Sequence, residues 1–382
     1  MRITFMGYFL DDKLPYEITA DEESDVWADQ SDLKKKVKDI VDSTKYNSRA
    51  LVLAWGYFGA GKTHKLHQIK KMVEKQNSGI CILAPLAQAP KNFSELIKSL
   101  FFDQVWDTFL DKFVKEFVQN NNSDEKIKTE IRQVTKSNPD LTRAFVKLRH
   151  TIRNQGSESS EVVQISQWMR GEKLNKFTRE SFGRQLKEDR DFVNLAESII
   201  RTLLVKGEDG ISKSVFWIVD DCHFLNDLGE KKFNAVYKGF KDIFDLSTGK
   251  FVLILSYAHG TADEIEILPD LKSRVTTTLA VLPLKKQTAL TYIKELHSNH
   301  TYAKNPNQTN RFYPLDEESA QTLINQIEET RGLRLLPRTI NKFLNYIVGK
   351  CSDEGLRKIK SEDVIKKFNQ YKSTLMAEED ID

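Results

Sequence analysis

The sequence predicts an α/β fold, with a parallel five-stranded sheet between helices, a helical insertion and a C-terminal helical lid. Three observations support this. Five apolar segments of strand length alternate with segments whose apolar residues recur at helical spacing, a pattern typical of parallel sheets. A glycine-rich segment joins the first predicted strand to a helix. After Leu284 the strand pattern stops and only helical patterns follow.

The predicted strands are short apolar runs of the kind that a sheet buries beneath helices on both faces. They cover residues 50–54, 79–84, 215–221, 251–256 and 278–282. A long helical stretch, about 103–205, separates the second strand from the third and can carry partner specificity. Four further helices are predicted at 287–297, 316–331, 337–351 and 361–371. Pro337 suits the first turn of its helix.

These patterns divide the chain into four parts. We expect an N-terminal segment with a first helix (1–48), a core (49–284) that contains the insertion, a helical lid (285–372) and an acidic tail (373–382), in which Glu378–Asp382 lack fixed structure. The net charge of +3 is too small to indicate nucleic-acid binding by itself. No apolar run is long enough to cross a bilayer. Three scattered cysteines predict a cytoplasmic chain without disulfides or zinc.

The glycine-rich segment is a phosphate-binding loop of the form G-x-x-x-x-G-K-T. Its backbone N–H groups and the dipole of the following helix attract phosphate, so we expect it to bind ATP. Lys62 would pair with the β- and γ-phosphates, and Thr63 would place its hydroxyl on Mg²⁺. The predicted nucleotide-binding residues are Gly56, Tyr57, Phe58, Gly59, Ala60, Gly61, Lys62, Thr63 and His64.

The ends of the third and fourth strands supply polar residues for the same chemistry. Four apolar residues precede Asp220 and Asp221, as in a Walker B strand. Asp220 is placed to hold the hydration shell of Mg²⁺, and Asp221 to orient the attacking water. A glutamate often fills the second role, so the shorter Asp221 predicts slow or absent hydrolysis. Ser256 ends the fourth strand, where it can touch the γ-phosphate or the water.

Two arginines are candidates for contacts to the γ-phosphate. Arg274 ends a helix just before the fifth strand, from which it can project towards the nucleotide of a neighbouring subunit. Arg338 begins a lid helix and can fold back onto the phosphates in cis. The alternative for each is an ordinary solvated arginine. His64 and His67 lie three residues apart, but without a third ligand we expect a packed or solvated pair rather than a metal site.

A run of basic residues, expected near the end of the insertion, has two interpretations. Such a run is most simply the solvated face of a helix. The alternative is phosphate contacts to DNA. The residues concerned are Arg143, Lys147, Arg149 and Arg153.

Taken together, these motifs resemble the AAA+ ATPases over about residues 26–372. The similar branch contains replication initiators of the origin-recognition type, transposition ATPases and signalling STAND ATPases. The Asp220-Asp221 pair resembles STAND proteins, whereas most AAA+ members have Asp-Glu. The lid spacing from Gly332 to Arg338 is longer than usual, which leaves Arg334 as a rival for the lid arginine. A W-x-x-G-E segment at Trp168–Glu172 resembles ATP-binding proteins of BREX-type phage-resistance systems.

The resemblance implies an ATP-driven switch that hydrolyses ATP, forms homo-oligomers and acts on DNA or a DNA-processing partner, in phage defence if the last similarity holds. We also expect a protein partner from the same pathway and no membrane association. The alternative is a STAND-like signalling or scaffold protein that binds nucleotide and hydrolyses little. A small-molecule kinase is disfavoured because the lid and the insertion do not suggest an acceptor pocket.

Overall fold

The computed structural model describes residues 16, 31–44, 48–76, 79–120, 122–136, 138–174, 184–206, 213–247, 249–301 and 310–379. Most of the predicted N-terminal segment, and residues 380–382 of the predicted tail, lie outside these residues. Residues 373–379 of that tail are helical, so the expectation that Glu378 and Glu379 lack fixed structure was wrong. The chain divides into two compact units. The sheet unit holds Val37–Trp55 and Ile69–Leu279, and the loop–lid unit holds Gly56–Gln68 and the chain from Ala280 onward, together with the N-terminal residues up to Lys36. The domain boundaries that the sequence suggested stay predictions.

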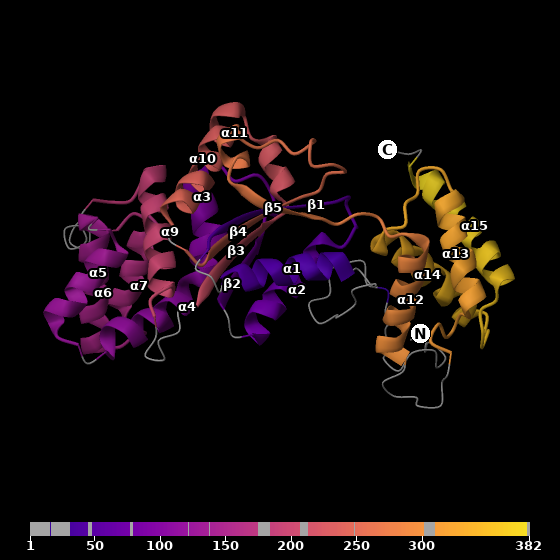
Figure 1. The fold of residues 1–382 in the computed structure, drawn as a ribbon, viewed down its shortest axis with the longest axis horizontal. Coiled ribbons are helices and arrows are strands. Elements are labelled where there is room, and N and C mark those ends of the chain that lie inside the picture. Colours follow the sequence, from indigo (N-terminus) through magenta and orange to yellow (C-terminus); the bar gives the residue numbers. More distant parts are fainter. Residues whose placement is uncertain are drawn as a thin grey trace. The chain divides into compact units, whose positions relative to one another are not determined.

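The sheet has five strands in the order β2-β3-β4-β1-β5, with parallel pairing of β2 with β3, β3 with β4 and β4 with β1. The strands are β1 (Ala50–Trp55), β2 (Gly79–Pro85), β3 (Ser214–Asp220), β4 (Phe251–Tyr257) and β5 (Val275–Ala280). Every residue of β3 and β4 is buried, as apolar runs in a central parallel strand require. This arrangement confirms the predicted α/β fold (Figure 1).

The predicted position of the fifth strand was wrong by three residues at its start. The prediction followed the apolar run at 278–282, but β5 begins at Val275. Three threonines form its centre, and Leu279 is its single buried residue. An edge strand needs little apolar burial, and β-branched threonine suits a strand. Thr276 also ties the strand to its neighbour, because its hydroxyl donates to the carbonyl of Leu51 at 3.0 Å.

Helices make up the rest of the sheet unit. Those outside the insertion are α3 (Phe93–Ile97), α10 (Glu230–Leu246), α11 (Pro269–Lys272) and parts of α1 (Ser31–Ser43) and α2 (Lys62–Lys75). The insertion holds α4 (Asp103–Phe113), α5 (Asp124–Val134), α6 (Pro139–Gln155), α7 (Ser160–Met169) and α9 (Asp189–Leu203). Two π-helical turns, at Lys98–Phe102 and Val114–Val118, precede and follow α4. The predicted helical character of the insertion is therefore confirmed.

The insertion shares one hydrophobic core with the sheet. Phe101 meets the β3 residue Trp217 edge-on, with ring centroids 5.0 Å apart, and Trp217 Nε1 donates to the carbonyl of Leu100 at 3.2 Å. Further out, Phe113 packs edge-on against Phe145 of α6 at 5.6 Å. Aromatic contacts at the start of the insertion and within it, together with the shared core, attach the insertion to the sheet.

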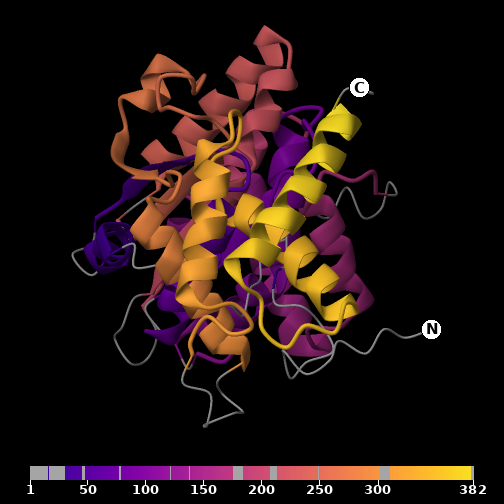
Figure 2. The same ribbon diagram turned by 90° about the vertical axis from the view of Figure 1, so that its right-hand side faces the viewer.

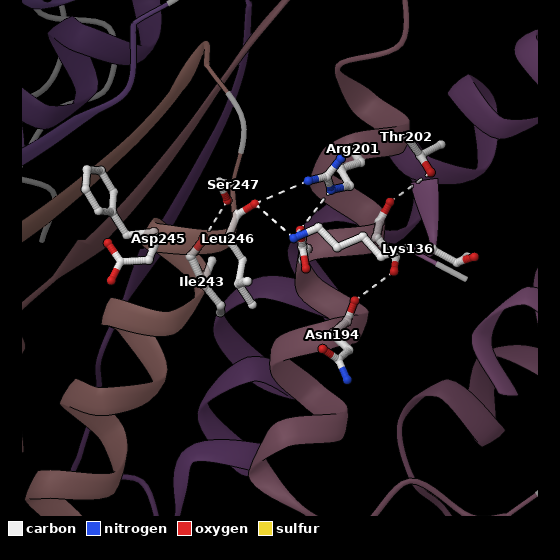
Figure 3. A network of polar contacts seen from close by, with 12 residues as sticks. Lys136, Asn194, Arg201, Thr202, Ile243, Asp245, Leu246 and Ser247 are labelled. Carbon is white, nitrogen blue, oxygen red and sulfur yellow. Dashed lines mark hydrogen bonds and ion pairs between the residues drawn. The ribbon is translucent and has the colours of Figure 1, made fainter. Parts of the chain in front are cut away.

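A polar network at the C-terminus of α10 strengthens that attachment (Figure 3). Lys136 and Arg201 both pair with the buried Glu197 of α9, and both donate to the carbonyl of Leu246 at 3.4 Å. Cations at this end of α10 also complement the helix dipole. The network therefore joins α9, α10 and the residues that follow α5.

The loop–lid unit contains the four predicted lid helices, which Figures 1 and 2 show in orange and yellow. They are α12 (Lys286–Thr301), α13 (Glu317–Glu329), α14 (Pro337–Asp353) and α15 (Ser361–Glu379). They enclose a separate hydrophobic core, in which the rings of Phe343 and Phe368 stack at 4.4 Å. Pro337 occupies the first turn of α14, as predicted. No helix in the described ranges is long and apolar enough to span a bilayer.

Candidate nucleotide-binding site

The phosphate-binding loop, Gly56–Thr63, connects β1 to α2, in the predicted strand–loop–helix context. Its glycines are needed for different reasons. Gly59 and Gly61 have φ angles of +82° and +91°, which side chains rarely adopt. A Cβ at Gly56 would lie 2.2 Å from the carbonyl oxygen of Val281. The motif therefore encodes a backbone path that other residues do not follow.

Lys62 is the first residue of α2 and is almost fully buried. Its ammonium donates to the carbonyls of Gly56 at 3.0 Å and Tyr57 at 3.1 Å, so the charge lies inside the curl of the loop. Thr63 and His64 follow in the first turn of the helix, both partly buried. A cation and a helix N-terminus in one place form an anion-binding site. The assignment of these residues to phosphate and Mg²⁺ stays a prediction.

One turn further on, Lys65 is buried as well, which the sequence did not reveal. Burial lowers the pKa of its ammonium to about 8, and the nearby charge of Glu295 partly opposes that change. The sequence offered no signal for this, because a lysine at this position of a helix is ordinarily solvated.

The lid arginines contact the loop directly. Arg338 donates its backbone N–H to the carbonyl of Gly59 at 3.3 Å, and its guanidinium lies 4.5 Å from the ring centroid of Phe58. Arg334 lies 3.7 Å from the ring centroid of Tyr57. The two rivals for the lid arginine therefore each stack on one aromatic residue of the loop. Tyr57 and Phe58 were predicted as nucleotide-binding residues of the loop, but nothing in the sequence predicted that their rings contact the lid arginines.

Of the two, Arg338 is joined to the loop more tightly. A Cβ at Gly59 would lie 2.8 Å from the Cβ of Arg338, so the two backbones are in close approach. Within the described residues, Nε of Arg338 is buried and has no hydrogen-bond partner. A buried donor without a partner is costly, and a phosphate oxygen would satisfy it.

The carboxylates at the end of β3 differ sharply from each other. Asp220 is the last residue of β3, is 1% exposed, and accepts the N–H of Asp221 at 2.9 Å. Asp221 lies just after the strand with φ +57° and ψ +34°, a left-handed conformation that is uncommon for a residue with a side chain. Its carboxylate is 3.7 Å from Nδ1 of His223. Backbone strain of this kind often accompanies function.

Ser256 lies one residue before the end of β4, where it pairs in register with Ala54 of β1. The side chain is fully buried, and its Oγ has no hydrogen-bond partner among the described residues. A hydroxyl in this condition fits a residue that completes its hydrogen bonding with a ligand. Its assigned role stays a prediction.

Arg274 lies between α11 and β5, two residues after the helix ends. It donates two hydrogen bonds of 3.2 Å to the carboxylate of Asp245, and a third of 3.2 Å to the carbonyl of Asp270. The carboxylate of Asp245 raises the pKa of Arg274 further. An arginine held in this way must release Asp245 before it can act on a neighbouring subunit, and that role also stays a prediction.

The basic run of the insertion is divided by its position on α6. Arg149 faces the core, is 3% exposed, and donates to the carbonyl of Phe117 at 2.6 Å and to Asp124 at 2.7 Å. Both interpretations of Arg149 from the sequence, solvated residue and DNA contact, were therefore wrong. Arg153, one turn later, is exposed and lies 3.3 Å from the same carboxylate. Arg143 and Lys147 lie on the outer side of α6.

The W-x-x-G-E segment forms the end of α7. Trp168 is buried in the core, as expected. Gly171 has φ +68°, and a Cβ there would lie 2.5 Å from the carbonyl oxygen of Leu186. These two residues are explained by packing, and nothing here supports the BREX similarity.

Magnesium and ATP fit the donor set of the predicted site. The described residues contain no group of three or more His, Cys, Asp or Glu that could hold a metal ion. Mg²⁺ at nucleotide sites needs only one or two protein ligands, since waters and phosphates supply the others. Thr63 and Asp220 are of the required type, and the buried Nε of Arg338 supplies an unused donor for phosphate.

The fold is similar to that of the ORC2 protein of Aeropyrum pernix. The structure of its ADPNP–ADP complexes matches with a TM-score of 0.53 and 10% identity, over 95% of this chain and 72% of that one. Its ADP form matches with a TM-score of 0.51 and 10% identity, over 94% and 73%. A Walker-type ATPase of Pyrococcus abyssi matches with 14% identity over 96% and 79%, at a TM-score of 0.46. No protein-family model and no curated protein sequence matches the chain.

The predicted resemblance to the AAA+ ATPases is confirmed at the level of the fold. Both the parallel sheet and the lid helices take part in the match, since it covers nearly the whole chain.

Proposed function

We propose that this chain is an ATP-binding, Mg²⁺-dependent ATPase that acts as a switch, assembles into homo-oligomers, and works on DNA or on a DNA-processing partner. The observation that carries the proposal is the direct contact between Arg338 of the lid and the phosphate-binding loop. This contact links the residues that would bind ATP to the element that would respond.

A comparison of energies supports a response. The guanidinium of Arg338 lies over Phe58, whose side chain is 67% exposed. A cation–π contact at such a site is worth about 0.5–1 kcal/mol, whereas a hydrogen bond to a charged group is worth about 1.5–3 kcal/mol. A hydrogen bond to phosphate is therefore the stronger contact, so the guanidinium of Arg338 should leave the ring of Phe58 when ATP binds. Because Arg338 is in the first turn of α14, this movement would be passed to the lid helix.

The hydrolytic residues in the proposal are those at the strand ends. Bound ATP brings Mg²⁺ and a phosphoanhydride bond to the site. Asp220 would order the waters of the metal, Asp221 would orient the attacking water, and the unpartnered hydroxyl of Ser256 would donate to the γ-phosphate or the water. Lys62 would hold the phosphates in line.

Assembly and DNA action are the finer parts of the proposal. Arg274 of one subunit would complete the site of the next after releasing Asp245. DNA, and a protein partner from the same pathway, are proposed from the AAA+ resemblance. A role in phage defence is proposed from the W-x-x-G-E resemblance at Trp168–Glu172 alone.

Nucleotide binding is tested first. Titration calorimetry with ATP and Mg²⁺ should show saturable binding that Lys62→Ala abolishes. Arg338→Ala should bind ATP at least about tenfold more weakly, since it loses a charge-assisted contact. Arg334→Ala is the matched control and should change affinity little. If Arg334→Ala has the larger effect, Arg334 is the lid arginine.

Assembly and DNA binding are then tested separately. Gel filtration with a non-hydrolysable ATP analogue should show a larger species than without nucleotide, and Arg274→Ala should reduce turnover while leaving ATP affinity unchanged. Duplex binding should weaken steeply with salt. An unchanged elution volume would refute the proposed oligomerisation. Absence of duplex binding at low salt would refute the proposed action on DNA.

A second candidate function is a STAND-like nucleotide switch with little hydrolysis, which Asp221 favours. Its carboxylate is one methylene shorter than glutamate, and its backbone is held in a left-handed conformation. Turnover by the natural chain and by Asp221→Asn separates the two functions. The ATPase should lose turnover and keep ATP affinity, whereas a switch without turnover would be unaffected.

A further inference from the structure

A basic groove lies on the insertion, and its lining includes none of the residues assigned to nucleotide binding in the sequence. It has a volume of about 570 Å³ and is formed by α5, α6 and the start of α7. Cationic side chains project from two of these helices at intervals of four residues, which places each pair on one helix face. These are Lys128 and Arg132 on α5, and Arg143 and Lys147 on α6.

The acidic charges near the groove are already engaged. Glu161 is the one carboxylate among the lining residues, and it pairs with Lys147 at 2.8 Å and accepts from Thr151 at 2.9 Å. These contacts hold the pKa of Glu161 below its ordinary value. Lys128 pairs with Glu125 at 3.1 Å.

Two guanidiniums remain available, one on each wall. Both Arg132 and Arg143 are exposed, and neither side chain has an ion pair or hydrogen bond within the described residues. Each guanidinium offers five N–H donors in a planar fork that matches a carboxylate. Two such forks, one on α5 and one on α6, line the same groove and favour an anionic segment within it.

The floor of the groove indicates a peptide rather than a nucleic acid. Val146 and the aliphatic stems of the basic residues provide apolar surface. The lining includes no Phe, Tyr or Trp on which a base could stack. Apolar surface below a charged rim is the anatomy of a protein-binding surface. A suitable ligand therefore combines several carboxylates with an apolar side chain.

We propose that this groove receives the acidic end of a second copy of the chain, Glu378–Asp382. Within five residues this segment carries four carboxylates, on Glu378, Glu379, Asp380 and Asp382, and one apolar residue, Ile381. Two of these carboxylates suffice for the two available guanidiniums, Arg132 and Arg143, and the other two add long-range attraction to the basic lining. The docking rests on the proposed self-assembly and adds a contact outside the nucleotide site.

The test measures the affinity of the groove for the tail segment, in the absence of nucleotide. The receptor is the full chain with its tail carboxylates neutralised (Glu378→Gln, Glu379→Gln, Asp380→Asn, Asp382→Asn). A fluorescent peptide of residues 372–382 is titrated with it, and anisotropy should show saturable binding. Adding Arg132→Glu and Arg143→Glu should weaken binding at least about tenfold. The matched control, Lys231→Glu with Lys232→Glu on α10, makes the same change in net charge and should have little effect.

Two further measurements make the result specific. A peptide with lysine at the four acidic positions should bind the Arg132→Glu/Arg143→Glu receptor and not the original one. A mixture of tail-neutralised chain with groove-reversed chain should associate in sedimentation velocity, although neither associates alone, because one brings an intact groove and the other an intact tail.

Four results would overturn the inference. The first two come from the peptide titration: no binding at all, or equal weakening of binding by the α10 control. The third is peptide binding without association in the mixture, which means docking within one chain. The fourth is that the groove substitutions, and not the control, abolish duplex binding. A failure of ATP to change the oligomer in gel filtration would count against the proposed function alone, since the peptide titration contains no nucleotide.

Discussion

Replacing Arg149 with leucine should destabilise the sheet unit strongly, although sequence patterns place this arginine in a solvated basic run. The guanidinium is buried, and its Nε and Nη2 atoms donate to the carbonyl of Phe117 at 2.6 Å and to Asp124 at 2.7 Å. These bonds join α6 to the π-helical turn before α5 and to the first residue of α5. Leucine would fill part of the volume and leave the carbonyl without its donor.

The expected loss in the free energy of unfolding combines the two hydrogen bonds that are removed with the cost of a buried unpaired donor that is removed as well. Each hydrogen bond to a charged group contributes about 1.5–3 kcal/mol, so the two lost bonds are worth about 3–6 kcal/mol. Within the described residues Nη1 of Arg149 is buried without a partner, and its removal returns about 1–3 kcal/mol. Taken at matching ends of the two ranges, the net loss is about 2–3 kcal/mol. For a unit of this size the melting temperature falls by about 2–4 °C per kcal/mol, which gives a decrease of about 4–12 °C.

Thermal melts by circular dichroism should show this decrease for Arg149→Leu and little change for Arg153→Leu. Arg153 is the matched control, because it is on the same helix and pairs with the same Asp124, but is 57% exposed. Hydrogen bonding to Arg149 holds the pKa of Asp124 below its ordinary value, so Arg149→Leu should also raise that pKa in a carboxyl NMR titration. Equal melting temperatures for the two variants would refute the reasoning.

Three further predictions concern the loop, the end of β3 and the helix α2. Gly59→Ala should lower ATP affinity at least tenfold, because its methyl group would lie 2.8 Å from the Cβ of Arg338. The control Gly332→Ala, at φ +90° with open space around it, should lower stability and leave ATP affinity unchanged; similar affinities of the two variants in calorimetry would contradict this. Asp221→Gly should relieve a left-handed backbone and stabilise the chain by about 0.5–1 kcal/mol while removing turnover, so an unchanged melt would argue against strain. Lys65→Met should stabilise the chain at pH 7, where the natural lysine is buried and charged. Between about pH 8 and pH 10.5 Lys65 is protonated in the unfolded natural chain and neutral in the folded one, so the natural chain becomes more stable as the pH rises. The stability difference between Lys65→Met and the natural chain should therefore shrink over this range, and a difference that does not change with pH would contradict the reasoning.

Some features of this protein follow from local sequence. The glycines of the loop specify a backbone that a side chain would strain or block, so their spacing identified the loop, its flanking strand and its helix. The apolar runs identified β1 to β4 because a strand buried on both faces has no polar positions. The start of the edge strand β5 was mispredicted, because the threonines that form its centre are not part of an apolar run.

Other features depend on which segments meet in space. Nothing near Arg149 in sequence signals burial; its position depends on Phe117 and Asp124, more than twenty residues away. The pairing of Arg334 with Tyr57 and of Arg338 with Phe58 spans almost three hundred residues. Local propensity reflects each residue's own backbone and immediate neighbours, whereas burial and charge pairing depend on partners that only the folded chain brings together. The sequence by itself therefore predicted a phosphate-binding loop between Gly56 and Thr63, and only the tertiary structure decided which arginines touch that loop.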